Sequence, residues 1–283
     1  MNIAISGASG LVGSTARSHL ASQGYQVRPI SRSMLSLEAA ELAKALEGVH
    51  VVIHLAGAPI MKRWTKGYRR EIYDSRIETT RRLTAAMEEM DAPPHTFITA
   101  SAVGIYPTTG TRDEGSDAVA DNFLGEVCRD WEAAAAGAPA GVRTVMLRFG
   151  VILSSNGGAL QKMLPPFRLG LGGPIAGGRQ TVPWVHMDDV MGILSLAISK
   201  EEVTGPVNVT APQPVTNKAF TRALGRALGR PAFMPLPAFA LQLVYGQAAT
   251  VLTEGQHAIP TKVKGYGYVF RYPELDKALE ALV

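Results

Sequence analysis

The sequence holds a single cysteine, Cys128, so the chain cannot form an internal disulfide, and we expect it in a reducing compartment. Long hydrophobic runs are also missing. The most apolar late stretch, PAFALQLVYGQAATVL, is too short to span a bilayer and contains Gly246 and Gln247. NIAISGASG follows Met1 directly, without a basic and apolar leader, so we expect no signal peptide. These absences predict a cytoplasmic protein with no membrane partner.

A strong charge imbalance and clustered metal ligands are absent as well. The net charge is only +4, and the lysines and arginines are scattered except in GYRREIYDSRIETTRR, which is typical of a cationic helix face. We therefore predict no nucleic-acid partner. We find no set of Cys, His, Asp and Glu residues with the spacing typical of a metal site, so we predict no metal site.

The first thirty residues contain the strongest functional signal. A short apolar strand, NIAIS, runs into a glycine-rich turn, the helical stretch STARSHLASQG and a second strand, YQVRPISR. This unit is typical of dinucleotide binding, because glycines let the backbone approach a pyrophosphate and the helix N-terminus offers free N–H groups. A plain structural turn is the alternative. The residues of this turn that we assign to the cofactor are Gly7, Ser9, Gly10, Leu11, Val12 and Gly13.

The end of the second strand indicates which cofactor is bound. An acidic residue there accepts hydrogen bonds from the ribose hydroxyls of NAD, whereas an arginine accommodates the 2′-phosphate of NADP. This strand ends at Ser31 and Arg32, and the first acid is Glu38. We therefore predict that NADP(H) is preferred over NAD(H), with Ser31 and Arg32 contacting the cofactor. A solvated arginine in a loop is the alternative.

Further stretches extend the pattern along the chain. GVHVVIHLAGAPI, HTFITASAVGIYP, WVHMDDV and GPVNVTAPQPVT, together with the G-x-x-G-x-x-G turn, resemble the extended short-chain dehydrogenase/reductase superfamily. The segments DSRIETTRRL, NFLGEVCRDWE, LRFGVILSSNGGAL and IPTKVKGYGYVFRYPELDKAL are similar to an atypical, YfcH-like branch of the NAD-dependent epimerase/dehydratase family. These matches cover nearly the whole chain.

The resemblance implies an α/β fold, with a Rossmann-type doubly wound parallel sheet and a smaller C-terminal substrate lobe. It implies that GVHVVIHLAG is the fourth strand, followed by Leu55, Ala56 and Gly57 at the adenosine and ribose. HTFITAS would be the fifth strand and TVMLRFG the sixth. The chain then becomes rich in glycine and proline, as expected of ligand-binding loops. We expect the dinucleotide-binding domain at 1–150 plus 183–210, and the substrate lobe at 151–182 plus 211–283.

Family members that transfer hydride use a Ser or Thr with a Tyr-x-x-x-Lys pair and often a helper Asn. Ser101 matches the Ser, although counting back from Tyr106 lands on Ala102 instead. Phe123 and Val127 stand where Tyr and Lys are expected, and neither can move a proton or carry charge.

Other residues would therefore have to perform the chemistry. Arg76 falls near the helper position, and Tyr106 lies in the loop after the Ser101 strand. We predict Ser101, Tyr106 and Arg76 as catalytic residues. In this hypothesis Arg76 either lowers the pKa of the Tyr106 phenol or binds an anionic substrate. A pocket-lining role for Tyr106 is the alternative.

Two functional hypotheses follow. The first is an NADP(H)-dependent atypical epimerase, dehydratase or reductase that acts on a small molecule, such as a nucleotide sugar or a carbonyl compound. The second is a non-catalytic NADP(H)-binding regulatory protein, which the resemblance links to cell division; the missing Tyr and Lys favour it. A homodimer is left open, and the sequence does not identify the substrate.

Overall fold

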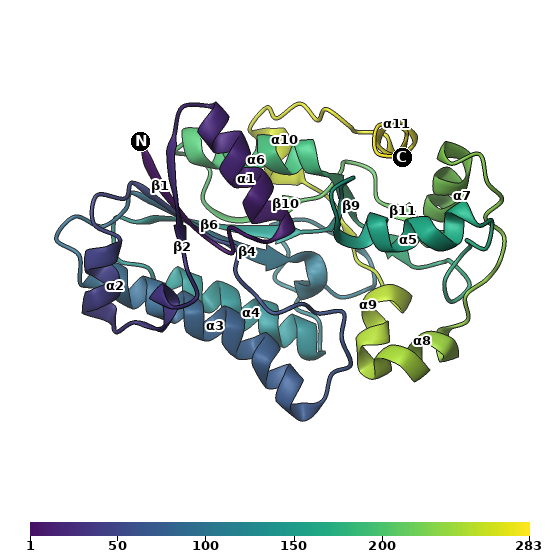
Figure 1. The fold of residues 1–283 in the computed structure, drawn as a ribbon, viewed down its shortest axis with the longest axis horizontal. Coiled ribbons are helices and arrows are strands. Elements are labelled where there is room, and N and C mark those ends of the chain that lie inside the picture. Colours follow the sequence, from purple (N-terminus) through teal and green to yellow (C-terminus); the bar gives the residue numbers. More distant parts are fainter.

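The computed structural model describes residues 1–283 and contains a six-stranded parallel sheet with helices on both faces (Figure 1). The strand order is β10-β6-β4-β3-β1-β2, and every neighbouring pair is parallel. This arrangement confirms the predicted doubly wound α/β fold. The strands are β1 (Asn2–Ser6), β2 (Gln26–Ile30), β3 (Val51–His54), β4 (Thr96–Ala102), β6 (Arg143–Phe149) and β10 (Gly205–Val209).

The strand count implied by the resemblance is wrong by one. Between β2 and β3 the chain forms only a 3₁₀ turn, η1 (Met34–Ser36), and a short helix, α2 (Ala39–Ala45). GVHVVIHLAG therefore supplies the third strand of the sheet rather than the fourth, and it pairs directly with β1. The strand order reverses between β1 and β3, which is where ligands bind at the carboxyl ends of strands in open α/β sheets.

Alternate residues of the strands pack into two hydrophobic layers. Ile3 and Ile5 of β1 face one layer, whereas Ala4 faces the other. The first layer is covered by α1 (Leu11–Ser22), α6 (Met187–Ser199) and α10 (Thr261–Gly265). The second is covered by α2, α3 (Lys66–Glu88) and α4 (Phe123–Ala136). None of the helices combines the length and the apolar content that crossing a membrane requires.

A third hydrophobic core lies in the second half of the chain. It contains Leu164, Trp184, Phe220 and Leu279, which come from four separate elements. Val263, by contrast, packs in the core of the main sheet. The predicted lobe boundaries stay a prediction. The remaining elements are β5 (Thr111–Arg112), β7 (Val151–Leu153), α5 (Gly158–Arg168), β8 (Thr181–Val182), β9 (Trp184–His186), β11 (Val215–Thr216), α7 (Asn217–Ala227), α8 (Ala238–Tyr245), α9 (Thr250–Thr253), β12 (His257–Ala258) and α11 (Leu275–Glu280).

Candidate active site

The glycine-rich turn between β1 and α1 lies against the end of β3. Gly7 has a φ of +69°, and a Cβ atom there would lie 2.7 Å from the carbonyl carbon of Leu55. A Cβ atom at Gly13 would lie 2.2 Å from the carbonyl oxygen of Gly7. Neither position has room for a side chain. Gly7 and Gly13 are therefore required for the close packing of this turn, which brings Leu55 and Ala56 beside it.

The N-terminus of α1 offers unpaired donors next to this turn. Gly10 caps the helix without a side-chain hydrogen bond, and no acidic residue occupies the first turn. The N–H groups of Leu11, Val12 and Gly13 have no acceptor in the protein, because the first bond of this helix is the one from Ser14 N to Gly10 O. Three free donors at the positive end of a helix dipole are suited to an anion.

Hydroxyl groups and a cation follow β2 at the same edge of the sheet. Ser31 Oγ lies 2.8 Å from Ser33 Oγ and accepts a hydrogen bond from the Met34 N–H at 3.1 Å. Arg32 is exposed, and its guanidinium forms no salt bridge. A phosphate placed here would meet a free guanidinium and two hydroxyls without a competing carboxylate.

A buried histidine, His54, connects the strand before the glycine-rich turn to β3 and α3. His54 ends β3, and its ring is hydrogen-bonded on one side to Ser6, the last residue of β1, and on the other to Thr79 of α3 at 3.1 Å. Burial, assisted by the nearby charge of Arg76, lowers the pKa of His54 to about 3. The imidazole therefore stays neutral and links β1, β3 and α3. Sequence reasoning missed this residue.

Arg76 is a largely buried cation that has no acidic partner. Its Nη1 and Nη2 atoms donate to the carbonyl oxygens of Ile72 and Ala58, at 3.0 and 2.9 Å. A Cβ atom at Gly57 would lie 3.1 Å from the Arg76 Cζ, so the guanidinium packs directly against the loop after β3. Burial lowers the pKa of Arg76. Two neutral carbonyls satisfy part of this donor set, and the Trp131 ring lies 5.3 Å from the guanidinium, but no carboxylate balances the charge.

The start of α4 is aromatic and apolar. Asn122 caps the helix by accepting from the Gly125 N–H, and Phe123 packs edge-on against Trp64 with ring centroids 5.2 Å apart. Val127 is buried in a hydrophobic cluster with Trp131. Neighbouring Cys128 is also buried, which raises the pKa of its thiol to about 12 and keeps it protonated. Phe123, Val127 and Cys128 therefore offer no proton-transfer group at neutral pH, and the acid in the first turn of this helix is the exposed Glu126.

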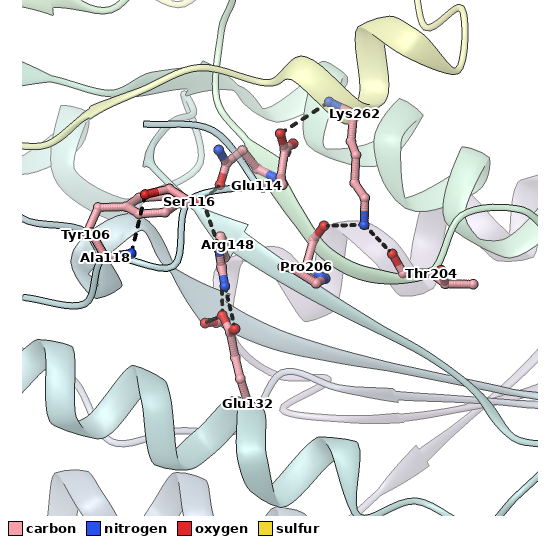
Figure 2. A network of polar contacts seen from close by, with 11 residues as sticks. Tyr106, Glu114, Ser116, Ala118, Glu132, Arg148, Thr204, Pro206 and Lys262 are labelled. Carbon is pink, nitrogen blue, oxygen red and sulfur yellow. Dashed lines mark hydrogen bonds and ion pairs between the residues drawn. The ribbon is translucent and has the colours of Figure 1, made fainter. Parts of the chain in front are cut away.

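A charged network lies further inside, between β4, α4 and β6 (Figure 2). Arg148 forms a two-pronged ion pair with Glu132, with Nε–Oε1 and Nη2–Oε2 distances of 2.8 and 2.7 Å. Ser101 Oγ donates to the same carboxylate at 2.6 Å. Arg148 Nη1 donates to the Tyr106 hydroxyl at 2.6 Å, and that hydroxyl donates to Asn208 at 2.9 Å. All four side chains in this chain of contacts, from Ser101 to Tyr106, are tied to one another.

The network places Tyr106 differently from the predicted arrangement. Its side chain is fully buried, and its hydroxyl is occupied by Arg148 and Asn208. The guanidinium that contacts the phenol belongs to Arg148, so the predicted action of Arg76 on Tyr106 is not present. The pKa of Tyr106 is raised, because burial outweighs the opposing effect of Arg148. The phenol is thus a donor within the fold, and the geometry argues against proton transfer to a substrate.

The register of the active-site serine also becomes visible. Ser101 is buried and directed at Glu132, whereas Ala102 is the last residue of β4 and is partly exposed. Because neighbouring residues of a strand point to opposite sides, Ala102 points away from the side on which Ser101 meets Glu132. The catalytic role of Ser101 stays a prediction.

The same network continues to the C-terminal segment. Glu114 accepts from the Asn208 N–H at 2.9 Å and from the Lys262 N–H at 3.2 Å. Lys262 Nζ donates to the carbonyl oxygens of Thr204 and Pro206 at 2.6 and 3.1 Å, as Figure 2 shows. These bonds fix α10 to the edge strand β10. The network therefore holds the C-terminal part of the chain on the main sheet.

Free N–H donors at the switch point of a doubly wound parallel sheet are the arrangement typical of nucleotide-binding α/β proteins. The family model described as "NAD dependent epimerase/dehydratase family" matches residues 3–210, and the chain belongs to this family. A second model, a domain of unknown function named DUF1731, matches residues 236–282.

Relatives match the chain over its whole length. A mouse protein named "Epimerase family protein SDR39U1" is 38% identical and is covered completely, and the YfhF protein of Bacillus subtilis is 35% identical, with 98% of it covered. The crystal structure of human SDR39U1 (isoform 2) with NADPH is 37% identical, with a TM-score of 0.93, and the match covers 100% of this chain and 99% of that one.

Proposed function

We propose that this chain binds NADP(H) along the carboxyl edge of β1, β2 and β3, and acts on a small molecule as an atypical epimerase, dehydratase or reductase. The observation that carries the proposal is the set of unpaired donors at this edge, namely the three free N–H groups of α1 and the Arg32 guanidinium. The NADPH held by the human relative supports it.

The residues present suit a phosphorylated dinucleotide. The turn from Gly7 to Gly13 would hold the pyrophosphate, because its donors are free and its glycines admit close approach. Ser31, Ser33 and Arg32 would hold the 2′-phosphate, and Leu55, Ala56 and Gly57 would line the ribose on the other side of the turn. When bound, the nicotinamide supplies a hydride acceptor or donor.

Arg76 is the charged residue best placed to bind a ligand beside this cofactor. It lies against Gly57, has no carboxylate partner and retains unused N–H donors. We propose that it binds an oxygen-rich or anionic group, from the substrate or from the cofactor ribose. Ser101 remains a candidate for orienting the substrate oxygen, and its hydroxyl and that of Tyr106 are hydrogen-bonded to Glu132 and Arg148 in the folded chain.

A non-catalytic, NADP(H)-binding regulator is the second candidate. Phe123 and Val127 offer no proton-transfer group, and the hydroxyl groups of Ser101 and Tyr106 are already occupied inside the network. In this candidate the bound nucleotide acts as a structural or sensing ligand. Both candidates require the same cofactor site, so they differ only in turnover.

Calorimetric titration of the apo protein with NADPH and NADH tests the cofactor proposal. Arg32→Asp should weaken NADPH binding by about 10- to 100-fold, the range expected for one charge-assisted contact, and should change NADH binding little. Arg28→Asp is a matched control, because Arg28 lies on β2, just before Arg32, but donates to the Glu47 carbonyl. Equal losses for both nucleotides, or no binding by the unaltered protein, would refute the proposal.

Turnover is tested separately by incubating the NADPH-loaded protein with carbonyl compounds and nucleotide sugars. Loss of absorbance at the reduced nicotinamide, with product detected by mass spectrometry, supports an enzyme. Tight NADPH binding without conversion of any compound supports the regulator.

A further inference from the structure

Two neighbouring segments in the second half of the chain combine exposed apolar side chains with nearby positive charge. Twelve large hydrophobic residues are exposed in the chain, and eight of them lie in only two segments, 169–171 and 233–244. Clusters of exposed apolar residues mark interaction sites in soluble proteins. The eight residues, which we call the apolar face, are Leu169, Leu171, Phe233, Met234, Leu236, Phe239, Leu243 and Val244.

The two segments of the apolar face are joined by backbone contacts. Met234 N donates to the Gly172 carbonyl at 3.1 Å, and Leu236 N donates to the Pro174 carbonyl at 2.9 Å. Figure 1 shows the second segment running from α7 along the edge of the molecule to α8. Of the residues in α8, only Leu241 is buried, although the helix sequence AFALQLVY is apolar almost all round. Such a helix is normally covered on every side.

The surroundings of the apolar face carry positive charge without acidic residues in the same segments. Neither 155–187 nor 203–253 contains an Asp or a Glu. The first range contains three cationic residues and the second contains four. They are Lys162, Arg168 and Arg179, and Lys218, Arg222, Arg226 and Arg230. The net charge of the whole chain is only +4, so the rest of the chain is net negative by three charges. The positive charge is thus concentrated in the segments that build this face.

Three of these arginines stand next to the apolar side chains. Arg222, Arg226 and Arg230 line a surface hollow of about 550 Å³ together with Phe233. Arg226 pairs with Asp276 of α11, while Arg222 and Arg230 form no salt bridge. Arg168 immediately precedes Leu169 at the end of α5.

We propose that this face docks on the surface of an anionic phospholipid bilayer. Acyl chains would cover the six aliphatic side chains and the two phenylalanines, and the arginines would contact the phosphates of the headgroups. A surface contact needs no spanning segment, so it is compatible with the absence of a membrane-crossing helix. It does depart from the sequence-based expectation of no membrane partner.

The charge pattern favours a bilayer over the two other occupants of an apolar surface. A second copy of the chain would bring the unpaired Arg222 and Arg230 of both copies into one interface, and like charges across an interface are unfavourable. A nucleic acid would pair with the arginines but would leave Leu169, Leu171 and Leu243 uncovered, because its outer surface is a phosphate backbone. An anionic bilayer can cover the apolar side chains with acyl chains and pair its phosphates with the arginines.

Cosedimentation with vesicles tests the proposal without reference to cofactor binding. The unaltered protein should bind vesicles of phosphatidylcholine with about 30% phosphatidylserine, and binding should fall sharply with salt and in pure phosphatidylcholine. Arg222→Gln, Arg226→Gln and Arg230→Gln combined should lower the affinity by about 100-fold, since each arginine near an anionic surface contributes about a fivefold factor. Phe239→Ser with Leu243→Ser should also release the protein.

Matched controls separate the face from general charge and apolar content. Arg70→Gln, Arg81→Gln and Arg129→Gln remove the same charge from exposed arginines paired with acids on α3 and α4, and Val269→Ser removes an apolar side chain that is 86% exposed elsewhere. Both controls should bind vesicles like the unaltered protein. No vesicle binding, equal losses in the controls, or a dimer in sedimentation velocity that Phe239→Ser with Leu243→Ser dissociates would overturn the proposal.

Discussion

The turn at α1 and the charged network at β6 treat their polar groups in opposite ways. At the turn, the N–H groups of Leu11, Val12 and Gly13 and the Arg32 guanidinium have no partner in the protein. In the network, Ser101, Glu132, Arg148 and Tyr106 are saturated by one another. A free donor at an open edge is available to a ligand, whereas a saturated buried network contributes to the uniqueness and rigidity of the fold.

Because the network is buried and its charges are paired, we expect the largest loss of stability when one of its charged residues is removed. Glu132→Ala leaves the Arg148 guanidinium buried without its counter-charge, and breaking one side of such a pair costs about 3–5 kcal/mol. Denaturant unfolding should show this loss in the free energy of unfolding. The exposed pair of Glu78 and Arg81 is the matched control, where Glu78→Ala should cost no more than about 1 kcal/mol. Similar losses in both variants would show that the buried pair contributes no more to stability than the exposed one.

Arg76 sharpens the comparison because it is charged and largely buried but has no counter-charge. Arg76→Met should leave the free energy of unfolding unchanged or raise it, since an uncompensated cation is removed from the interior. The same change should weaken NADPH binding by about 10-fold, because the lost contact is charge-assisted. Calorimetry and denaturant unfolding on one preparation measure both effects.

Arg76→Lys is the control for charge at this position. It should retain most of the NADPH affinity if the positive charge is what the ligand requires. A loss of stability without a loss of affinity in Arg76→Met would show that Arg76 belongs with the network, and the proposed ligand-binding role would be wrong.

The two regions also differ in how far the sequence predicts them. The turn is local: Gly7, Gly13 and Arg32 lie within about thirty residues, and Gly7 and Arg32 follow strands that the apolar pattern reveals. Glu132 and Arg148 belong to a helix and a strand, and no periodicity indicates that their side chains meet. The pairing of β4 with β6 places Arg148 beside Ser101, which only the assembled sheet shows. For the same reason, the sequence does not show that Arg148 and Asn208 occupy the Tyr106 hydroxyl.

Two other differences between the expected and the observed structure can be explained from the sequence. The strand count was wrong because the stretch between β2 and β3 holds only η1 and α2, and its apolar residues lack the alternation or continuous run of a further strand. His54 is the one ionisable residue in the buried run VVIH, and a polar residue at the end of a buried strand points to a partner on a neighbouring element. The sequence does not reveal that α8 is exposed, because its apolar sequence would equally suit a helix that other elements cover.

The last expected effect depends on pH and concerns His54, which lies next to the turn and has both ring nitrogens hydrogen-bonded within the protein. Its pKa is about 3 in the folded protein and 6.5 when unfolded, so between these values the unfolded chain binds a proton that the folded protein does not. The free energy of unfolding should therefore fall as the pH drops below about 6.5. His54→Gln removes this proton, so from pH 6.5 to 4.5 the unaltered protein should lose about 2 kcal/mol more than the variant. Parallel stability curves, measured by denaturant unfolding, would show that the imidazole is not held neutral by the fold.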